Sequence, residues 1–190
     1  MYRQYEVLDG LPTYGAMAVP ITHNNELFVS EGYVVKFFRD NGTEWIANFQ
    51  LGCTDTSHVI WNDNTKVIVV IAGGIGYVIN PNRVEPIRIF DYDISHFIEM
   101  NNGSMIISNE ADIIILDENG TVEKRYDNIG FDGIGSLKLE ENILTGLVYD
   151  INSYDNIDDA WIPFSINLKT DEIKIEYKPK EEIKHWWKFW

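Results

Sequence analysis

Two short motifs in the chain contain the residue types of a serine hydrolase triad. Residues 55–58 read Asp-Thr-Ser-His, and residues 93–96, which begin 38 positions later, read Asp-Ile-Ser-His. A hydrolase gathers one serine, one histidine and one aspartate in a single cleft and has no use for a second copy elsewhere in the fold. We therefore expect a structural role for both motifs, and the sequence predicts no catalytic residue and no enzyme.

The glycine cluster at residues 73–76, Gly-Gly-Ile-Gly, could hold a phosphate group, because the backbone amides of such loops bind anions. Neither a lysine followed by serine or threonine nor a helical pattern comes after it, so we interpret it as a hairpin turn. His23 and His185 occur in unrelated contexts, and the histidines predict no metal centre.

An acidic segment at residues 150–160 separates the second and third predicted strands of the last unit. The equivalent strands of the other units have only two or three residues between them. Insertions into one unit of a repeat often form binding surfaces. A solvated loop without a function is the alternative interpretation. The residues expected to contact a partner are Asp150, Tyr154, Asp155, Asp158, Asp159 and Trp161.

Calcium is a second interpretation of this segment. Asp150 and Asn152 fit the first two ligand positions of an EF-hand loop, but Tyr154 occupies the third and no glycine follows. The motif is incomplete, and we predict neither a metal ion nor a cofactor.

The last 13 residues of the sequence, 178–190, are called the tail below. Ile183, Trp186, Trp187 and Trp190 fall at i, i+3, i+4 and i+7, which predicts one face of a short amphipathic helix with lysines on another face. Such a helix could bind a membrane interface. We favour a helix that packs on the rest of the chain, because a short helix is only marginally stable alone.

A repeat of 38 to 39 residues positions these motifs. Asn25, Asn64, Asn102 and Glu141 each come just before a run of β-forming residues, and turn signals follow at matching distances. A period near 40 with about four short strands per unit is typical of propeller blades. We expect an all-β domain over residues 1–177 with four four-stranded units, at residues 16–50, 57–90, 95–126 and 134–177.

These units resemble the blades of WD-repeat and quinoprotein-like propellers, although the Trp-Asp dipeptide is absent from the unit ends. The resemblance implies a binding scaffold, and it implies that His58 and His96 join hydrogen bonds that brace the blades. It also implies a small four-bladed propeller or ring. Residues 1–7 would supply an extra closing strand; otherwise the ring stays open and its edges pair in a homodimer.

The formal charge of −15 disfavours nucleic acid and anionic membranes as partners. No secretion signal or membrane span is apparent, so we expect a cytoplasmic protein. Its size, charge and compartment resemble those of bacterial immunity proteins, small acidic inhibitors that neutralise a cognate toxin. We therefore expect a domain that binds a basic protein such as a nuclease toxin. The alternative is a ligand-sensing or assembly propeller that binds a small molecule or peptide.

Overall fold

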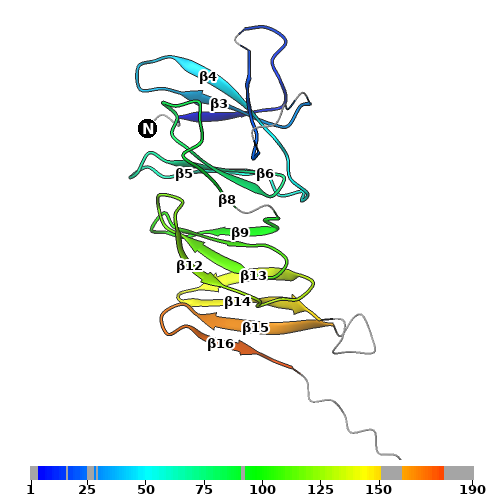
Figure 1. Ribbon diagram of the computed structural model, residues 1–190. Helices are drawn as coiled ribbons and strands as arrows, with labels where there is room; N and C mark the ends of the chain where they lie inside the picture. Colours follow the sequence, from blue (N-terminus) through cyan, green and yellow to red (C-terminus); the bar gives the residue numbers. More distant parts are fainter. Residues whose placement is uncertain are drawn as a thin grey trace, which may run out of the picture.

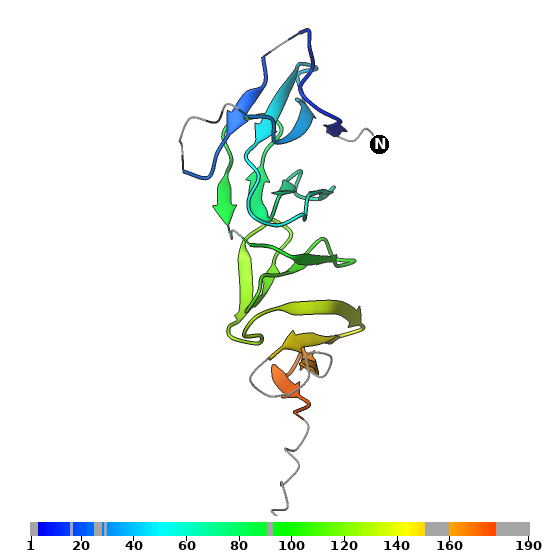
Figure 2. The ribbon, with the colours of Figure 1, turned by 90° about the vertical axis from the view of Figure 1, so that its right-hand side faces the viewer.

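The described part of the chain is built from β-strands. The computed structural model describes residues 4–15, 17–24, 28, 30–90, 93–150 and 160–177. They form sixteen strands in four sheets of four. The sheets follow one another along the chain and stack in a column, with the first sheet at one end and the fourth at the other (Figure 1, Figure 2). The predicted all-β fold with four four-stranded units is confirmed.

Three of the sheets are antiparallel meanders in chain order. The second sheet contains β5 (His58–Trp61), β6 (Ile68–Ala72), β7 (Ile75–Ile79) and β8 (Arg88–Phe90). The third contains β9 (His96–Glu99), β10 (Met105–Ser108), β11 (Ile113–Leu116) and β12 (Val122–Tyr126). The fourth contains β13 (Ile134–Glu140), β14 (Ile143–Tyr149), β15 (Trp161–Asn167) and β16 (Glu172–Ile175). These strands lie where the sequence predicts the second, third and fourth units.

The first sheet is assembled differently from the expected pattern. Its order is β1-β3-β4-β2, and its strands are β1 (Tyr5–Leu8), β2 (Val19–Ile21), β3 (Tyr33–Phe38) and β4 (Glu44–Phe49). The N-terminal strand β1 pairs antiparallel with β3, and β2 pairs parallel with β4. The expectation that residues 1–7 close a ring is therefore corrected, because β1 completes the first sheet itself.

The core lies between successive sheets, because each of its three clusters joins two neighbours. One cluster joins the first and second sheets, another the second and third, and another the third and fourth. Strand β10 shows the pattern: Ile107 belongs to the cluster shared with the second sheet, and Ile106 to the cluster shared with the fourth. Inner strands therefore bury both faces, which explains their unbroken runs of isoleucine and valine.

The ring does not close in the described part of the chain. None of the three core clusters includes residues of both the first and the fourth sheets, and these sheets lie at opposite ends of the column (Figure 1). Of the two outcomes expected from the sequence, the structure has the open one. Pairing of sheet edges in a homodimer stays a prediction.

Polar contacts between sheets add to the apolar core. The indole N–H of Trp45 donates to the carbonyl of Pro81 at 2.7 Å, which links the first two sheets. Between the third and fourth sheets, Asp171 accepts a hydrogen bond from the Tyr126 hydroxyl at 2.9 Å and pairs with Lys124. These contacts fix neighbouring sheets relative to one another, as the core clusters do.

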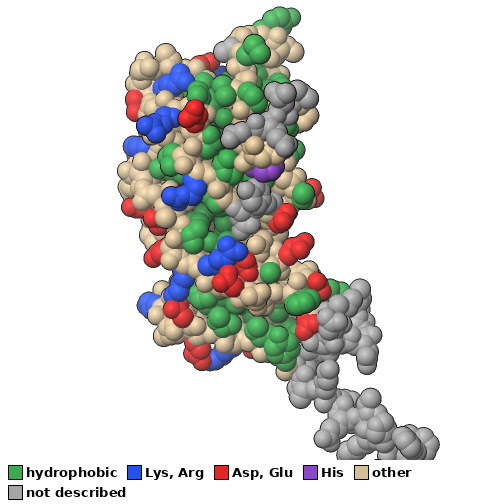
Figure 3. Space-filling model, viewed as in Figure 1, with side chains coloured by type: hydrophobic (Ala, Val, Ile, Leu, Met, Phe, Trp, Pro, Cys, Tyr) green, Lys and Arg blue, Asp and Glu red, His purple; other side chains and the backbone are tan. Residues whose placement is uncertain are grey.

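The predicted helix of the tail lies outside the described residues. In the ranges that the structure describes, no helix is long and apolar enough to cross a membrane. Hydrophobic side chains form patches on the visible face of the column, with charged side chains scattered among them (Figure 3).

Candidate functional site

The two Asp-x-Ser-His motifs lie beside one another where the second and third sheets meet. Nε2 of His58 lies 3.2 Å from Oε1 of Glu99 in the neighbouring sheet, and the His58 ring stacks on Phe97 with centroids 4.6 Å apart. Oγ of Ser57 accepts a hydrogen bond from the backbone N–H of Gly73. The serine is therefore engaged in holding a turn, and the histidine joins two sheets.

The second motif is also engaged with the backbone. Nδ1 of His96 lies 3.1 Å from Oγ of Ser95, and that hydroxyl in turn donates to the carbonyl of Ser108 at 3.3 Å. The first motif contacts the second through its own Thr56, whose hydroxyl donates to the carbonyl of Ser95 at 2.9 Å. The Thr56–Ser95 contact braces adjacent units, and the Ser95 hydroxyl is directed to the Ser108 carbonyl.

A cavity of about 370 Å³ lies between the two motifs. Its lining combines hydroxyl, carboxylate, imidazole and apolar groups, from Asp55, Thr56, Ser57, Ser95, His96, Phe97 and Leu137. Cavities of about 300 Å³ and more can hold small ligands when a few polar groups converge on them. This cavity is one of two candidate sites; the other, on the fourth sheet, is described below.

The glycine cluster forms the tight turn between β6 and β7. Gly73 and Gly74 have φ values of 55° and 90°, in the left-handed region where glycine is favoured. The N–H of Gly74 donates a hydrogen bond to the carbonyl of Thr56, and the carbonyl of Gly74 accepts one from the N–H of Ile94. The hairpin interpretation is confirmed, and the turn also ties the second sheet to the third.

Replacing Gly74 with alanine should lower the free energy of unfolding by about 1–3 kcal/mol, the usual range for a non-glycine residue held in strained backbone. The new Cβ would also lie 2.6 Å from Oγ1 of Thr54. Gly42→Ala is the matched control, because Gly42 has φ 82° with no atom within 4 Å of an added Cβ. Urea unfolding should show a larger loss of stability for Gly74→Ala than for Gly42→Ala. Equal losses would mean that the contact between the new Cβ and Thr54 has no effect.

The fourth sheet presents the main candidate site on the side that faces away from the third sheet. Side chains alternate along β14 and β15, so one set enters the core and the other points outward. We call the outward set the end face; its apolar members are Ile143, Leu147, Tyr149, Trp161 and Pro163. On this face Ile143 and Trp161 are 38% and 43% exposed.

Trp161 is held in a defined position on the end face. Its ring packs on Tyr149 of the paired strand with centroids 5.1 Å apart. The indole extends toward β13, where a Cβ added to Gly133 or Gly135 would lie 3.5–3.6 Å from its ring atoms. The indole therefore lies within van der Waals reach of β13 as well as of Tyr149.

The acidic insertion begins and ends beside this tryptophan. The N–H of Asp150 donates to the carbonyl of Ala160 at 2.9 Å, which closes the foot of the loop. Of the six predicted contact residues, the structure thus places Asp150 and Trp161 close together. Tyr154, Asp155, Asp158 and Asp159 lie outside the described residues, and their role stays a prediction.

The other apolar members of the end face were not predicted from the sequence. Leu147 and Tyr149 looked like ordinary strand residues, because alternation alone does not say which face of a sheet is covered. Their position in the last unit was the available signal, since the outer face of a terminal repeat is normally polar.

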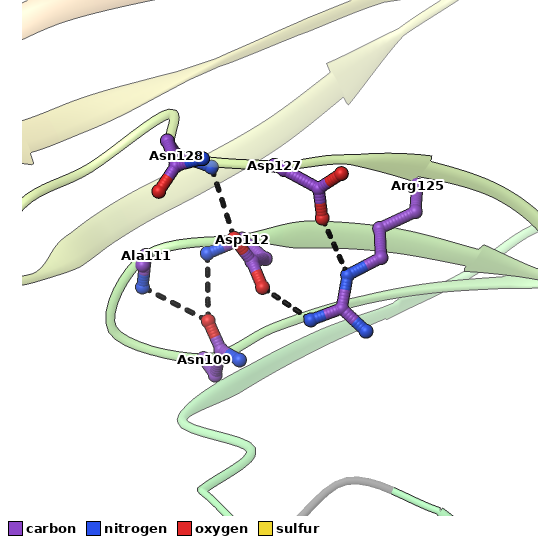
Figure 4. A network of polar contacts seen from close by, with 6 residues as sticks. All are labelled: Asn109, Ala111, Asp112, Arg125, Asp127 and Asn128. Atoms are coloured by element: carbon purple, nitrogen blue, oxygen red, sulfur yellow. Dashed lines mark hydrogen bonds and ion pairs between the residues drawn. The ribbon is translucent and has the colours of Figure 1, made fainter.

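A network of charged side chains joins the third sheet to the segment leading into the fourth (Figure 4). Asp112 pairs with the guanidinium of Arg125 and accepts a hydrogen bond from the N–H of Asn128 at 2.9 Å. Nε of Arg125 also donates to Asp127 at 2.7 Å. Partial burial alone would raise the pKa of Asp112, but the Asn128 N–H and the Arg125 guanidinium together hold it below its ordinary value of 3.8.

Because the pKa of Asp112 is lower in the folded state, its ionised form stabilises the protein above pH 3.8, and this contribution disappears as the pH falls through the folded pKa. Asp112→Asn should therefore be less stable than the parent chain at pH 7, and the difference should shrink below pH 3.8. Urea midpoints across this range measure the effect. A difference that does not change with pH would exclude the carboxylate as its source.

No group of three or more histidine, cysteine, aspartate or glutamate side chains in the described residues could hold a metal ion. Four successive four-stranded sheets make this an all-β protein of blade-like units that follow one another in an open stack.

No protein-family model and no curated protein matches the sequence. The WD40 domain of Neurospora crassa Pan2 is similar over 78% of this chain and 49% of its own, at 15% identity and a TM-score of 0.45. AztD of Citrobacter koseri is similar over 86% of this chain and 46% of its own, at 8% identity and a TM-score of 0.44. The computationally designed protein Ika8 is similar over 80% of this chain and 48% of its own, at 12% identity and a TM-score of 0.42. The chain spans about half the length of these three proteins.

Proposed function

We propose that this chain is a non-catalytic binding domain that recognises a basic partner protein at the end face and the adjoining acidic loop. The observation that carries the proposal is the position of Trp161, a half-exposed indole next to the hydrogen bond from the Asp150 N–H to the Ala160 carbonyl that closes the loop. Tryptophan is enriched among residues that dominate binding energy, especially where neighbouring groups exclude water. Carboxylates around it would attract and orient a basic surface.

More specifically, we propose that the domain is an inhibitor of the immunity-protein type, which neutralises a basic toxin such as a nuclease. The formal charge of −15 supports fast, salt-sensitive association with such a partner. Aspartates at the loop would occupy the place of nucleic-acid phosphates on the toxin.

The test is equilibrium binding of the purified chain to the protein encoded immediately upstream of its gene, at low and at moderate salt. We expect nanomolar affinity that weakens as salt rises, because screening acts on exposed charges. Failure to bind that protein would remove the toxin-inhibitor proposal and shift the search to other ligands.

Neutralising the loop should weaken this binding by roughly tenfold or more at low salt and flatten its salt dependence. The four changes replace aspartate with asparagine at Asp150, Asp155, Asp158 and Asp159. A matched control removes four exposed charges from the first two sheets, at Glu6, Asp9, Glu44 and Glu85. The control should keep most of the affinity. Equal losses in both variants would mean that net charge alone, and not the loop, determines binding.

A ligand-sensing domain is the second candidate function, and the cavity between the two Asp-x-Ser-His motifs favours it. A small hydroxylated molecule or a peptide terminus would suit its mixture of hydroxyl, carboxylate and imidazole groups. A thermal-shift screen separates the candidates, because a ligand for the cavity raises the melting temperature without any partner protein.

A further inference from the structure

The two ends of the stack are covered differently. On the outward side of the first sheet, Val34, Ile46 and Asn48 are at most 7% exposed, and residues of the segment between β1 and β3 line a pocket together with Asn48. The side chain of Asn48 fixes that segment by accepting from the N–H of Gly32 and donating to the carbonyl of Ser30. At the other end, Ile143 and Trp161 are 38% and 43% exposed. One end of the column is thus covered by its own chain.

The tail begins at the edge of the uncovered end. Strand β16 pairs with β15 so that Ile175 lies opposite Phe164, and the N–H of Glu176 donates to the carbonyl of Pro163. The N–H of Tyr177 then donates to the carbonyl of Ile175 at 3.1 Å, so the chain turns at Glu176 and does not continue the strand. The chain therefore leaves the sheet beside Pro163, an apolar member of the end face.

The tail has the length and pattern that the end face requires. As a helix, its 13 residues would span about 20 Å, and four strands span about 14 Å across the sheet. Its apolar side, formed by Ile183, Trp186, Trp187 and Trp190, matches the apolar members of the end face.

Charge favours the same arrangement. The tail has four lysines and two glutamates, which leaves 11 basic and 28 acidic residues in the rest of the chain. The rim of the end face has more carboxylates than lysines: Glu140, Asp150, Glu172 and Glu176 against Lys138 and Lys174. A basic helix is thus attracted to this end of the stack.

We propose that the tail folds back as an amphipathic helix over the end face of its own chain, with its tryptophans on Leu147, Tyr149 and Trp161. It covers the last sheet as the segment between β1 and β3 covers the first. If the end face is also the partner-binding surface proposed above, a basic partner must displace the tail. The following test needs no partner, so it is independent of that proposal.

The experiment uses the full chain with Cys53→Ser, which removes an exposed thiol, and Lys188→Cys, which carries a nitroxide spin label. Backbone amide signals are recorded by NMR before and after the nitroxide is reduced. We expect the oxidised label to abolish the signals of Thr145, Leu147 and Ser165 in the fourth sheet. Signals of Val34 and Ile46, at the other end of the column, should be unaffected.

The matched control carries Trp186→Ser, Trp187→Ser and Trp190→Ser in the same labelled chain, and it should keep all the fourth-sheet signals. Retained signals in the chain with its tryptophans would overturn the proposal, as would losses confined to another sheet. Spin-labelled molecules are also mixed with isotope-labelled molecules that carry no label. If the fourth-sheet signals were lost as strongly in that mixture as in molecules that carry both labels, the tail of a second copy would cover the end face. That result would overturn the intramolecular arrangement.

Discussion

Replacing Ile106 with alanine is expected to lower the free energy of unfolding by about 2–5 kcal/mol, the usual cost of truncating a fully buried isoleucine. The side chain has no exposed area and belongs to the core between the third and fourth sheets. In a stack where each core cluster joins only neighbouring sheets, the damage should be local. Hydrogen exchange should therefore accelerate more in β13–β16 than in β5–β8.

Ile107→Ala is the matched comparison, because it is the next residue of the same strand, equally buried, with its side chain in the opposite core cluster. It should lower stability by a similar amount but loosen the contact between the second and third sheets. If both variants accelerated exchange equally throughout the chain, the four sheets would unfold as one unit and the local model would be wrong.

Trp161→Ala is expected to weaken binding of the basic partner by about 2 kcal/mol, or roughly thirtyfold, as for other central tryptophans in interfaces. The change removes a 43% exposed ring that packs on Tyr149, so its effect on folding should be smaller than its effect on binding. Isothermal titration calorimetry measures the affinity, and urea unfolding checks the fold.

Tyr14→Ala is the control for this substitution, because Tyr14 is 91% exposed and belongs to the segment that follows the first strand, far along the column from the end face. Its affinity should match that of the parent chain. Both variants are also measured with the three tail tryptophans changed to serine, so that competition from the tail does not mask the result. Unchanged affinity for Trp161→Ala in both backgrounds would exclude the end face as the binding surface.

The repeat predicted most of the fold because strand alternation and turn residues recur in step in the last three units. Gly103 and Gly120, for example, lie at positive φ in turns that the sequence marks clearly. The first unit was the exception. Phe28 and Ser30 were expected in a strand at residues 26–30, but neither lies in one, and β1 takes the place beside β3. A pattern of alternation identifies a strand without identifying its neighbour, which tertiary packing decides.

The candidate site was predicted only in part for the same reason. Asp150 and Trp161 were identifiable because an insertion interrupts the repeat between them. Leu147 and Tyr149 were not, because their importance depends on whether another sheet covers them. That is a property of the order in which sheets stack, and it is not encoded in the strand itself.

The open end of the column also affects how the length of such a protein is determined. In a closed ring, the angle between blades fixes their number, and a blade cannot be added without changing every interface. Here the fourth sheet offers a face on which a fifth could be built, using contacts of the kind that already join the first four. A gene encoding this fold could therefore gain or lose a unit at that end while the existing interfaces stay intact. A helix or partner bound to the end face would block such an addition, whereas a further sheet would extend the column.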